Sequence, residues 1–328
     1  MRVARLPAFR RGYWRVWLAL VPLAALSTTA GPSVASAPVP AVLTPVDVVN
    51  PRGHVTDHVI VISIDGLRPD AIERFGAATL QRLMRHGSYS LAATTIVPSR
   101  TLPSHTSMLT GADLEQHGVT WNSEEMEVHG HVATPTIFAA AKQAGFHTAA
   151  FFSKEKFEHL AVPGTLDHVD VPNGWPGKRS ADHTIDIAEH YLETHQPNLL
   201  FVHLGEPDFA GHFVGWMTPP YAWAVREADD ELAELLQTAD SVFGSGNYTV
   251  IVTSDHGGHG RDHGSADPRD VTIPWIAWGK GVVPGKVLDP GIRTMDTAAT
   301  TLWLLGVALP DGSVGKPVAA AFEVPVPN

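Results

Sequence analysis

The chain has 328 residues, 44% of them hydrophobic and 17% charged, which suits one large α/β domain or two smaller ones. Its formal net charge of −11 argues against nucleic-acid backbones and anionic membranes as partners. Cysteine is absent, which excludes disulfides and a thiolate nucleophile, so any metal ion must be held by aspartate, histidine or hydroxyl groups.

The first 37 residues have the composition of an export signal. Arginines without acidic residues precede an apolar core at residues 16–26, which is too short for a good membrane span. Cleavage after Ala37 or after Ala35 fits the small residues that follow, and Arg10-Arg11 leaves a twin-arginine route open. We expect a signal peptide at 1–37, a secreted or periplasmic (cell-envelope) mature chain, and no stable membrane span after cleavage. Removing the five arginines of the signal lowers the formal net charge from −11 to −16.

Strand and helix patterns alternate through the rest of the chain. Residues 38–56 read as a linker, and residues 57–328 as one domain. Apolar runs predict strands at 58–64, 89–97, 147–152, 198–204, 248–253 and 271–277. Helical patterns cover 69–86, 101–109, 134–144, 180–195, 220–239 and 296–305. This alternation predicts an α/β fold with a single doubly wound, mostly parallel sheet and helices on both faces.

Acidic residues follow three of the predicted strands. Asp65 follows the first, Glu206 and Asp208 follow the strand at 198–204, and Asp255-His256 follows the strand at 248–253. Ligands of such sheets bind outside the carboxyl ends of the strands. Asp208 and His212 are four residues apart, so one helical turn or a tight loop would aim both at one ion. The number of groups suits two divalent ions about 4 Å apart that hold one phosphoryl group.

A nucleophile is available at the predicted start of the helix at 101–109. Thr101 lies where the helix dipole and free N–H groups favour an anion, although a threonine there is also an ordinary helix cap. Arg100 beside it can clamp a phosphate or form a surface salt bridge. No G-x-S-x-G motif is present, which argues against a Ser-His-Asp hydrolase.

Five segments, in this order, resemble the alkaline phosphatase superfamily, and most closely its type I phosphodiesterase/nucleotide pyrophosphatase branch. They are ISIDGLRPD (62–70), PSRTLPSHTSMLTG (98–111), HGVTWN (117–122), EPDFAGHFVG (206–215) and SDHGGHG (254–260). The segments are short individually, but together and in order they are specific.

The resemblance implies two divalent metal ions, expected to be zinc, and a threonine nucleophile. One ion would be held by Asp208, His212 and a later histidine. The other would be held by Asp65, Asp255, His256 and the Thr101 hydroxyl. Thr101 would form a phosphothreonine intermediate that an activated water then hydrolyses. Asn122 and the Thr101 backbone N–H would stabilise the phosphoryl oxygens.

Two assignments remain open in the sequence. The last ligand of the first ion is His259 or His263. We favour His263, because its His-Gly pair after a spacer matches the compact relatives and because His259 follows Asp255 so closely. Glu206 is expected to cap the turn rather than to orient a ligand.

The function expected from the sequence is an exported two-metal phosphoric-ester hydrolase that acts on a small phosphate ester. Phosphodiester or nucleotide pyrophosphate bonds are preferred, because a monoester needs a further cation and only Arg100 and the Lys178-Arg179 pair are evident. The alternatives are a phosphomonoesterase, a phosphonoacetate-type hydrolase, and a non-catalytic, metal-stabilised binding protein. No specific nucleic-acid binding is expected, and the sequence does not predict the oligomeric state.

Overall fold

The computed structural model describes residues 54–173 and 179–323. The expected signal peptide at 1–37 and most of the expected linker at 38–56 lie outside the described residues. The strands of the described part are β1 (Val59–Ile64), β2 (Ser88–Thr94), β3 (Thr148–Phe151), β4 (His168–Asp170), β5 (Leu199–Leu204), β6 (Thr249–Thr253), β7 (Thr272–Gly279) and β8 (Lys286–Val287).

All of these strands belong to one sheet with the order β4-β3-β5-β1-β6-β7-β2-β8. The strands from β4 to β6 are parallel, whereas β7 runs antiparallel to both β6 and β2. Ile64 of β1 pairs with Leu204 of β5, and Ser63 pairs with Thr253 of β6. The carboxyl ends of the three central strands therefore lie at one edge of the sheet.

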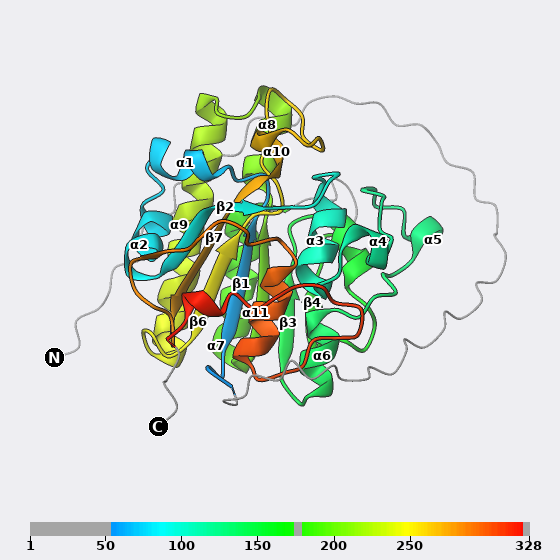
Figure 1. The fold of residues 1–328 in the computed structure, drawn as a ribbon, viewed down its shortest axis with the longest axis vertical. Coiled ribbons are helices and arrows are strands. Elements are labelled where there is room, and N and C mark those ends of the chain that lie inside the picture. Colours follow the sequence, from blue (N-terminus) through cyan, green and yellow to red (C-terminus); the bar gives the residue numbers. More distant parts are fainter. Residues whose placement is uncertain (1–53, 174–178, 324–328) are drawn as a thin grey trace. The chain divides into compact units, whose positions relative to one another are not determined.

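Helices cover both faces of the sheet, as Figure 1 shows. The α-helices of the described part are α1 (Pro69–Arg74), α2 (Ala78–His86), α3 (Thr101–Thr110), α4 (Leu114–His117), α5 (Met126–His129), α6 (Ile137–Gln143), α7 (Ala181–His195), α8 (Glu206–Val214), α9 (Pro219–Phe243), α10 (Pro268–Val271) and α11 (Asp296–Leu304). None of the helices within 54–173 and 179–323 combines the length and apolar character that crossing a membrane requires.

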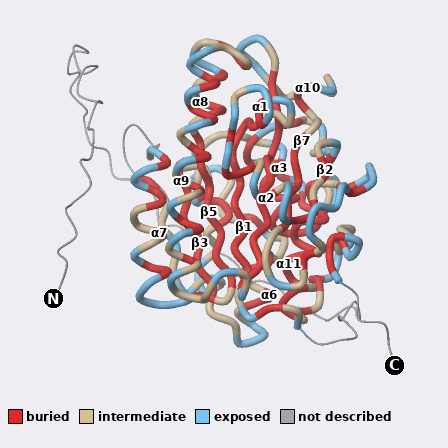
Figure 2. The backbone as a smooth tube through the Cα atoms, turned by 90° about the vertical axis from the view of Figure 1, so that its left-hand side faces the viewer, coloured by how far each residue is buried: buried red, intermediate tan, exposed pale blue. Residues whose placement is uncertain are grey.

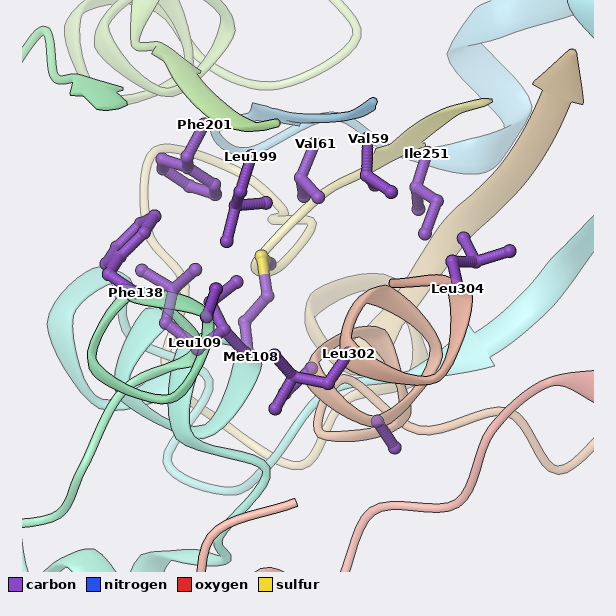
Figure 3. Close-up of a cluster of buried hydrophobic side chains, with 14 of the residues drawn as sticks. Val59, Val61, Met108, Leu109, Phe138, Leu199, Phe201, Ile251, Leu302 and Leu304 are labelled. Atoms are coloured by element: carbon purple, nitrogen blue, oxygen red, sulfur yellow. The ribbon is translucent and has the colours of Figure 1, made fainter. Parts of the chain in front are cut away.

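The central strand β1 is buried on both faces, which explains its unbroken apolar sequence (Figure 2). Val59 and Val61 belong to an apolar cluster that includes side chains of α3, α6 and α11, shown in Figure 3. Ile60 and Ile62 belong to a second cluster with side chains of α2, α7 and α9. Because successive strand residues face opposite sides, one six-residue segment contributes to both halves of the core.

The predicted fold class is confirmed, but individual elements differ, and the helices α4, α5, α8 and α10 were not among those predicted. The helix predicted over 69–86 is two helices, α1 and α2, separated at Gly76, whose φ of +70° ends the first one. The edge strands β4 and β8 were not predicted, because three and two residues are too few to show an alternating pattern.

Acidic side chains gather where α7 packs against α9. Burial and the negative charges of Glu234 and Asp182 raise the pKa of Glu231 to about 8. Burial and the negative charge of Glu206 raise the pKa of Glu227 to about 7. Carboxyls whose pKa is raised in the folded state stabilise it fully below their unfolded pKa near 4.5. That contribution is lost as the pH rises through about 7 to 8.

We expect Glu231→Gln to raise the free energy of unfolding by about 1 kcal/mol at pH ~9 and to change it little at pH ~5. The glutamine removes the charge that repels its neighbours but keeps the shape of the side chain. Denaturant titrations at the two pH values measure the effect, with Glu73→Gln on exposed α1 surface as the control. An equal gain at both pH values would contradict the electrostatic explanation.

Candidate metal centre at the sheet edge

Three aspartates meet where the central strands end. Asp65 follows β1, Asp255 lies just beyond β6, and Asp208 lies in the first turn of α8 after β5. The Asp208 backbone N–H donates to the Asp65 carbonyl over 3.0 Å, and the Gly66 N–H donates to Asp255 Oδ1 over 3.1 Å. Gly66 has a φ of +71°, and a Cβ there would lie only 2.9 Å from Asp208 Cα. The turn after β1 therefore requires glycine for the close approach of α8.

Asp65, Asp255 and His256 form a first group, named here the Asp65 group, that could hold a metal ion. His256 Nε2 lies 3.4 Å from Asp65 Oδ1 and 3.1 Å from Asp255 Oδ2. The Thr101 hydroxyl lies 3.3 Å from the same nitrogen. All four side chains are buried, so an ion here would contact protein oxygen and nitrogen on several sides.

Asp208, His212 and His263 form a second group, the Asp208 group. Asp208 Oδ1 lies 3.3 Å from His212 Nε2 and 3.5 Å from His263 Nε2, and the two imidazole nitrogens are 3.0 Å apart. His256 Nε2 is also within 4.8 Å of the ligand atoms of Asp208 and His263, so the two groups adjoin each other.

The three histidines are oriented alike by the backbone. Nδ1 of His256 bonds to the Gly257 carbonyl (2.8 Å), Nδ1 of His263 to the Ser99 carbonyl (2.7 Å) and Nδ1 of His212 to the Arg261 carbonyl (3.1 Å). A carbonyl only accepts, so each Nδ1 carries the proton and each Nε2 presents a lone pair. This is the tautomer that a metal-binding histidine needs.

Three buried carboxylate oxygens show that the residues fit metal ions. Asp65 Oδ1, Asp208 Oδ1 and Asp255 Oδ2 have no hydrogen-bond partner among the described residues. A buried charged oxygen without a partner is costly, unless a cation completes its surroundings. These are the same oxygens that face the histidine Nε2 atoms in the two groups.

The protonation states agree with this arrangement. Burial, together with His263, lowers the pKa of His256 to about 3, and burial also lowers the pKa of His263, so both imidazoles are neutral. Burial and the neighbouring Asp65 raise the pKa of Asp255 well above its usual range. The three aspartates therefore have more negative charge than the protein alone neutralises.

The proposed nucleophile lies at the start of α3. Thr101 is the first residue of this helix, and its side chain is buried. Asn122 Oδ1 accepts the Leu102 N–H over 2.9 Å, which leaves the Asn122 amide NH₂ as a donor. His105 bonds through Nδ1 to the Thr101 carbonyl and through Nε2 to Ser63 Oγ, each over 2.8 Å, and so fixes α3 on β1.

Two residues that contact the aspartates of the site were missed in the sequence. Lys154 Nζ lies 2.6 Å from both Asp65 Oδ2 and Asp208 Oδ2, and its side chain is 4% exposed. His203 of β5 bonds through Nε2 to Asp65 Oδ2 (3.0 Å) and through Nδ1 to Ser153 Oγ (2.8 Å). Lys154 follows the predicted strand at 147–152 at the same sheet edge, so a search for bases as well as acids at strand ends would have found it.

The cations near the site differ from those evident in the sequence. Arg100 is exposed beside Gly264, and Lys178 lies outside the described residues, whereas Arg179 pairs with Asp170. Lys156 instead donates to the Asn122 carbonyl over 2.8 Å. The expectation that no cation besides Arg100 and the Lys178-Arg179 pair lies at the site was therefore wrong, because Lys154 and Lys156 are there.

The structure shows the contacts of the residues left open above, which are His259, His263 and Glu206. His259 Nδ1 bonds to Asp270 Oδ1 over 2.6 Å, away from both groups, whereas His263 belongs to the Asp208 group. Glu206 Oε1 accepts the Ala181 N–H at the start of α7, which is a capping contact, and burial raises its pKa to about 7.

Comparisons with known proteins show what the chain is similar to. The sequence profile described as "Type I phosphodiesterase / nucleotide pyrophosphatase" matches residues 59–264. GPI ethanolamine phosphate transferase 1 of Emericella nidulans is 23% identical over 72% of this chain, and the chain spans 29% of that relative's length.

Solved structures share the fold. Murine ectonucleotide pyrophosphatase/phosphodiesterase 5, as an inactive threonine-to-alanine variant in complex with AMP, has a TM-score of 0.71 at 16% identity and covers 81% of this chain and 100% of its own. The alkaline phosphatase PafA has a TM-score of 0.69 at 13% identity, covering 82% of this chain and 99% of its own. The resemblance noted in the sequence is confirmed at the level of the family: the chain belongs to the type I phosphodiesterase/nucleotide pyrophosphatase family, and it shares its fold with the alkaline phosphatase PafA.

Proposed function

We propose that the protein is an exported two-metal phosphoric-ester hydrolase that uses Thr101 as its nucleophile and prefers phosphodiester or nucleotide pyrophosphate bonds. The observation that carries the proposal is the convergence of three unpartnered carboxylate oxygens and three histidine Nε2 atoms beside a buried threonine hydroxyl. The family match supports the substrate class, and the inactive threonine variant of the murine relative supports the nucleophile. The arginine-rich leader supports export.

The Asp65 group with Thr101 would hold one divalent ion, and the Asp208 group would hold the other. Ions at these positions lower the pKa of bound hydroxyl groups and neutralise phosphate charge. Zinc suits a donor set of carboxylate and imidazole with neutral Nε2 atoms.

The chain's own residues then perform the transfer. Thr101 Oγ1 attacks phosphorus, a Thr101 O–P bond forms, and the bond from phosphorus to the leaving oxygen breaks. The Asn122 amide NH₂ and the Thr101 backbone N–H donate to the phosphoryl oxygens as charge develops on them. Water then displaces Thr101 from phosphorus, which returns the free hydroxyl.

A phosphomonoesterase is the second candidate, and Lys156 favours it. A terminal phosphate carries one more negative charge than a diester and needs a further cation. The Lys154 ammonium already contacts two carboxylates, so its charge is largely neutralised. The Lys156 ammonium donates to the Asn122 carbonyl over 2.8 Å, and no carboxylate of the described residues forms an ion pair with it, although burial and Lys154 lower its pKa.

A substrate comparison tests both candidates. We expect bis-p-nitrophenyl phosphate and thymidine p-nitrophenyl phosphate to be hydrolysed with a higher kcat/KM than p-nitrophenyl phosphate. We further expect Lys156→Met to lower kcat/KM about tenfold for the monoester and by less for the diesters, because only the dianion uses the added charge. Faster monoester hydrolysis by the unaltered protein would make the phosphomonoesterase the first candidate. Hydrolysis of phosphonoacetate in the same assay tests the remaining alternative, a phosphonoacetate-type hydrolase.

A matched pair of histidine variants tests the last ligand. We expect His263→Ala to lower bound zinc from two ions per chain towards one and kcat/KM by about a hundredfold. His259→Ala, whose imidazole contacts Asp270, should keep both ions. Elemental analysis of the purified proteins measures the zinc content, and loss of zinc in His259→Ala alone would exchange the two assignments.

A further inference from the structure

Lys154 contacts one aspartate from each candidate ion site. Its ammonium lies 2.6 Å from Asp65 Oδ2 and 2.6 Å from Asp208 Oδ2, with all three side chains at least nine-tenths buried. Within 54–173 and 179–323, no other lysine or arginine pairs with Asp65, Asp208 or Asp255. One buried cation therefore faces three buried carboxylates.

The two oxygens of each bridged aspartate have different surroundings. Oδ2 of Asp65 and Oδ2 of Asp208 bond to Lys154, whereas Oδ1 of each is the unpartnered oxygen that faces the histidine Nε2 atoms. Lys154 therefore leaves the proposed ion-binding oxygens open. It is compatible with bound ions, and it also keeps a positive charge beside them.

The balance of charge depends on whether ions are present. Without ions, Lys154 is the positive charge nearest to the three carboxylates. Its ammonium donates to Asp65 Oδ2 and Asp208 Oδ2 over 2.6 Å each, so two buried carboxylates hold it as a cation. With two divalent ions bound, the carboxylates are already neutralised, and the ammonium repels the ions.

We propose that Lys154 is an internal counter-ion that keeps the centre folded before metal ions bind, at the expense of the affinity for those ions. The inference rests on the two-ion site proposed above. Removing one member of a buried ion pair leaves an uncompensated charge, so the loss falls mainly on the metal-free protein. A change that destabilises the metal-free protein more than the ion-bound protein must, by thermodynamic linkage, increase the affinity for the ions. Loss of Lys154 is such a change. Lys154 would thus allow the chain to fold first and acquire its ions afterwards.

The experiment compares Lys154→Met with the unaltered protein, each stripped with a chelator and then loaded with zinc. Methionine keeps most of the length of the side chain without the charge. We expect the metal-free variant to melt ~10 °C lower than the metal-free unaltered protein, and the zinc-loaded pair to differ by less than ~3 °C. Competition with a zinc indicator should show about tenfold tighter zinc binding by the variant.

Lys142→Met is the control for losing a lysine–aspartate pair elsewhere. Lys142 Nζ lies 2.9 Å from Asp167 Oδ1, and both side chains of this pair are partly exposed. Its substitution should shift the melting temperature equally with and without zinc and leave zinc affinity unchanged.

A double variant covers the case in which Lys154→Met does not fold without zinc. Lys154→Met with Asp208→Asn removes one positive and one negative charge and should recover most of the stability of the metal-free protein. If Lys154 served only to fill space, the second substitution would recover nothing, and the inference would be overturned.

The outcomes separate this inference from the proposed function. The unaltered protein could bind two zinc ions while Lys154→Met loses equal stability with and without zinc. That result would overturn the counter-ion role and leave the two-ion site standing. Weaker zinc binding by Lys154→Met would do the same. An unaltered protein that binds no zinc would overturn both the inference and the two-ion site.

Discussion

Thr101→Ala is expected to lower kcat/KM for bis-p-nitrophenyl phosphate by about ten-thousand-fold, because the atom that bonds to phosphorus is lost. Thr101 is buried at the start of α3 with its hydroxyl 3.3 Å from His256 Nε2, and its loss leaves both aspartate groups in place. Zinc content should stay near two ions per chain. Steady-state kinetics and elemental analysis of the same sample measure the two effects together.

Thr101→Ser is the matched control, because it keeps the hydroxyl and removes only a methyl group. We expect it to retain most of the activity and to form a phosphoserine that acid quenching traps. Full activity in Thr101→Ala would exclude the nucleophile proposed here. An unaltered protein that binds zinc but turns over no ester would instead support the binding-protein alternative.

Asp255→Asn is expected to have opposite effects on activity and on metal-free stability. Asparagine keeps an oxygen for the Gly66 N–H but turns a neutral NH₂ towards the ion position, so kcat/KM should fall about a thousandfold with loss of zinc. In the metal-free protein, the same change removes a buried carboxyl group that Lys154 does not contact directly. Its free energy of unfolding should therefore rise by about 1 to 3 kcal/mol.

Thermal unfolding of the chelated protein and zinc analysis of the loaded protein measure the two effects. Asp167→Asn, at a partly exposed ion pair with Lys142, is the control and should lower stability slightly. A fall in metal-free stability in Asp255→Asn would show that its carboxylate already has a partner in the absence of ions.

The fold and the groups that could hold ions were largely predictable, for physical reasons. A strand such as β1 is buried on both faces and shows this as an unbroken apolar run, and an aspartate directly after such a run must lie at the sheet edge. His212 is placed by its four-residue spacing from Asp208 on one helix. These relations are local, so the sequence displays them.

Lys154 and His203 were missed because their roles depend on contacts between distant segments. Lys154 lies 89 residues from Asp65 and 54 from Asp208, and no pattern around it marks the bridge. His203 lies inside an apolar strand, where its side chain reads as part of the core until β1 is placed beside β5. The orientation of the histidines likewise depends on carbonyls of Ser99 and Arg261, which only the folded loops bring near.

The close approach at Gly66 has a consequence for how the enzyme family can diversify. Because the Asp65 carbonyl bonds to the Asp208 N–H, and no side chain fits between Gly66 and α8, main-chain packing sets the separation of the two aspartate groups. The distance between the two aspartate groups is thus fixed by backbone contacts. It does not depend on the rotamers of the surrounding side chains or on the surrounding loops. In the function proposed above, loops around the leaving group would therefore be free to change in length and sequence without altering the distance between the two aspartate groups.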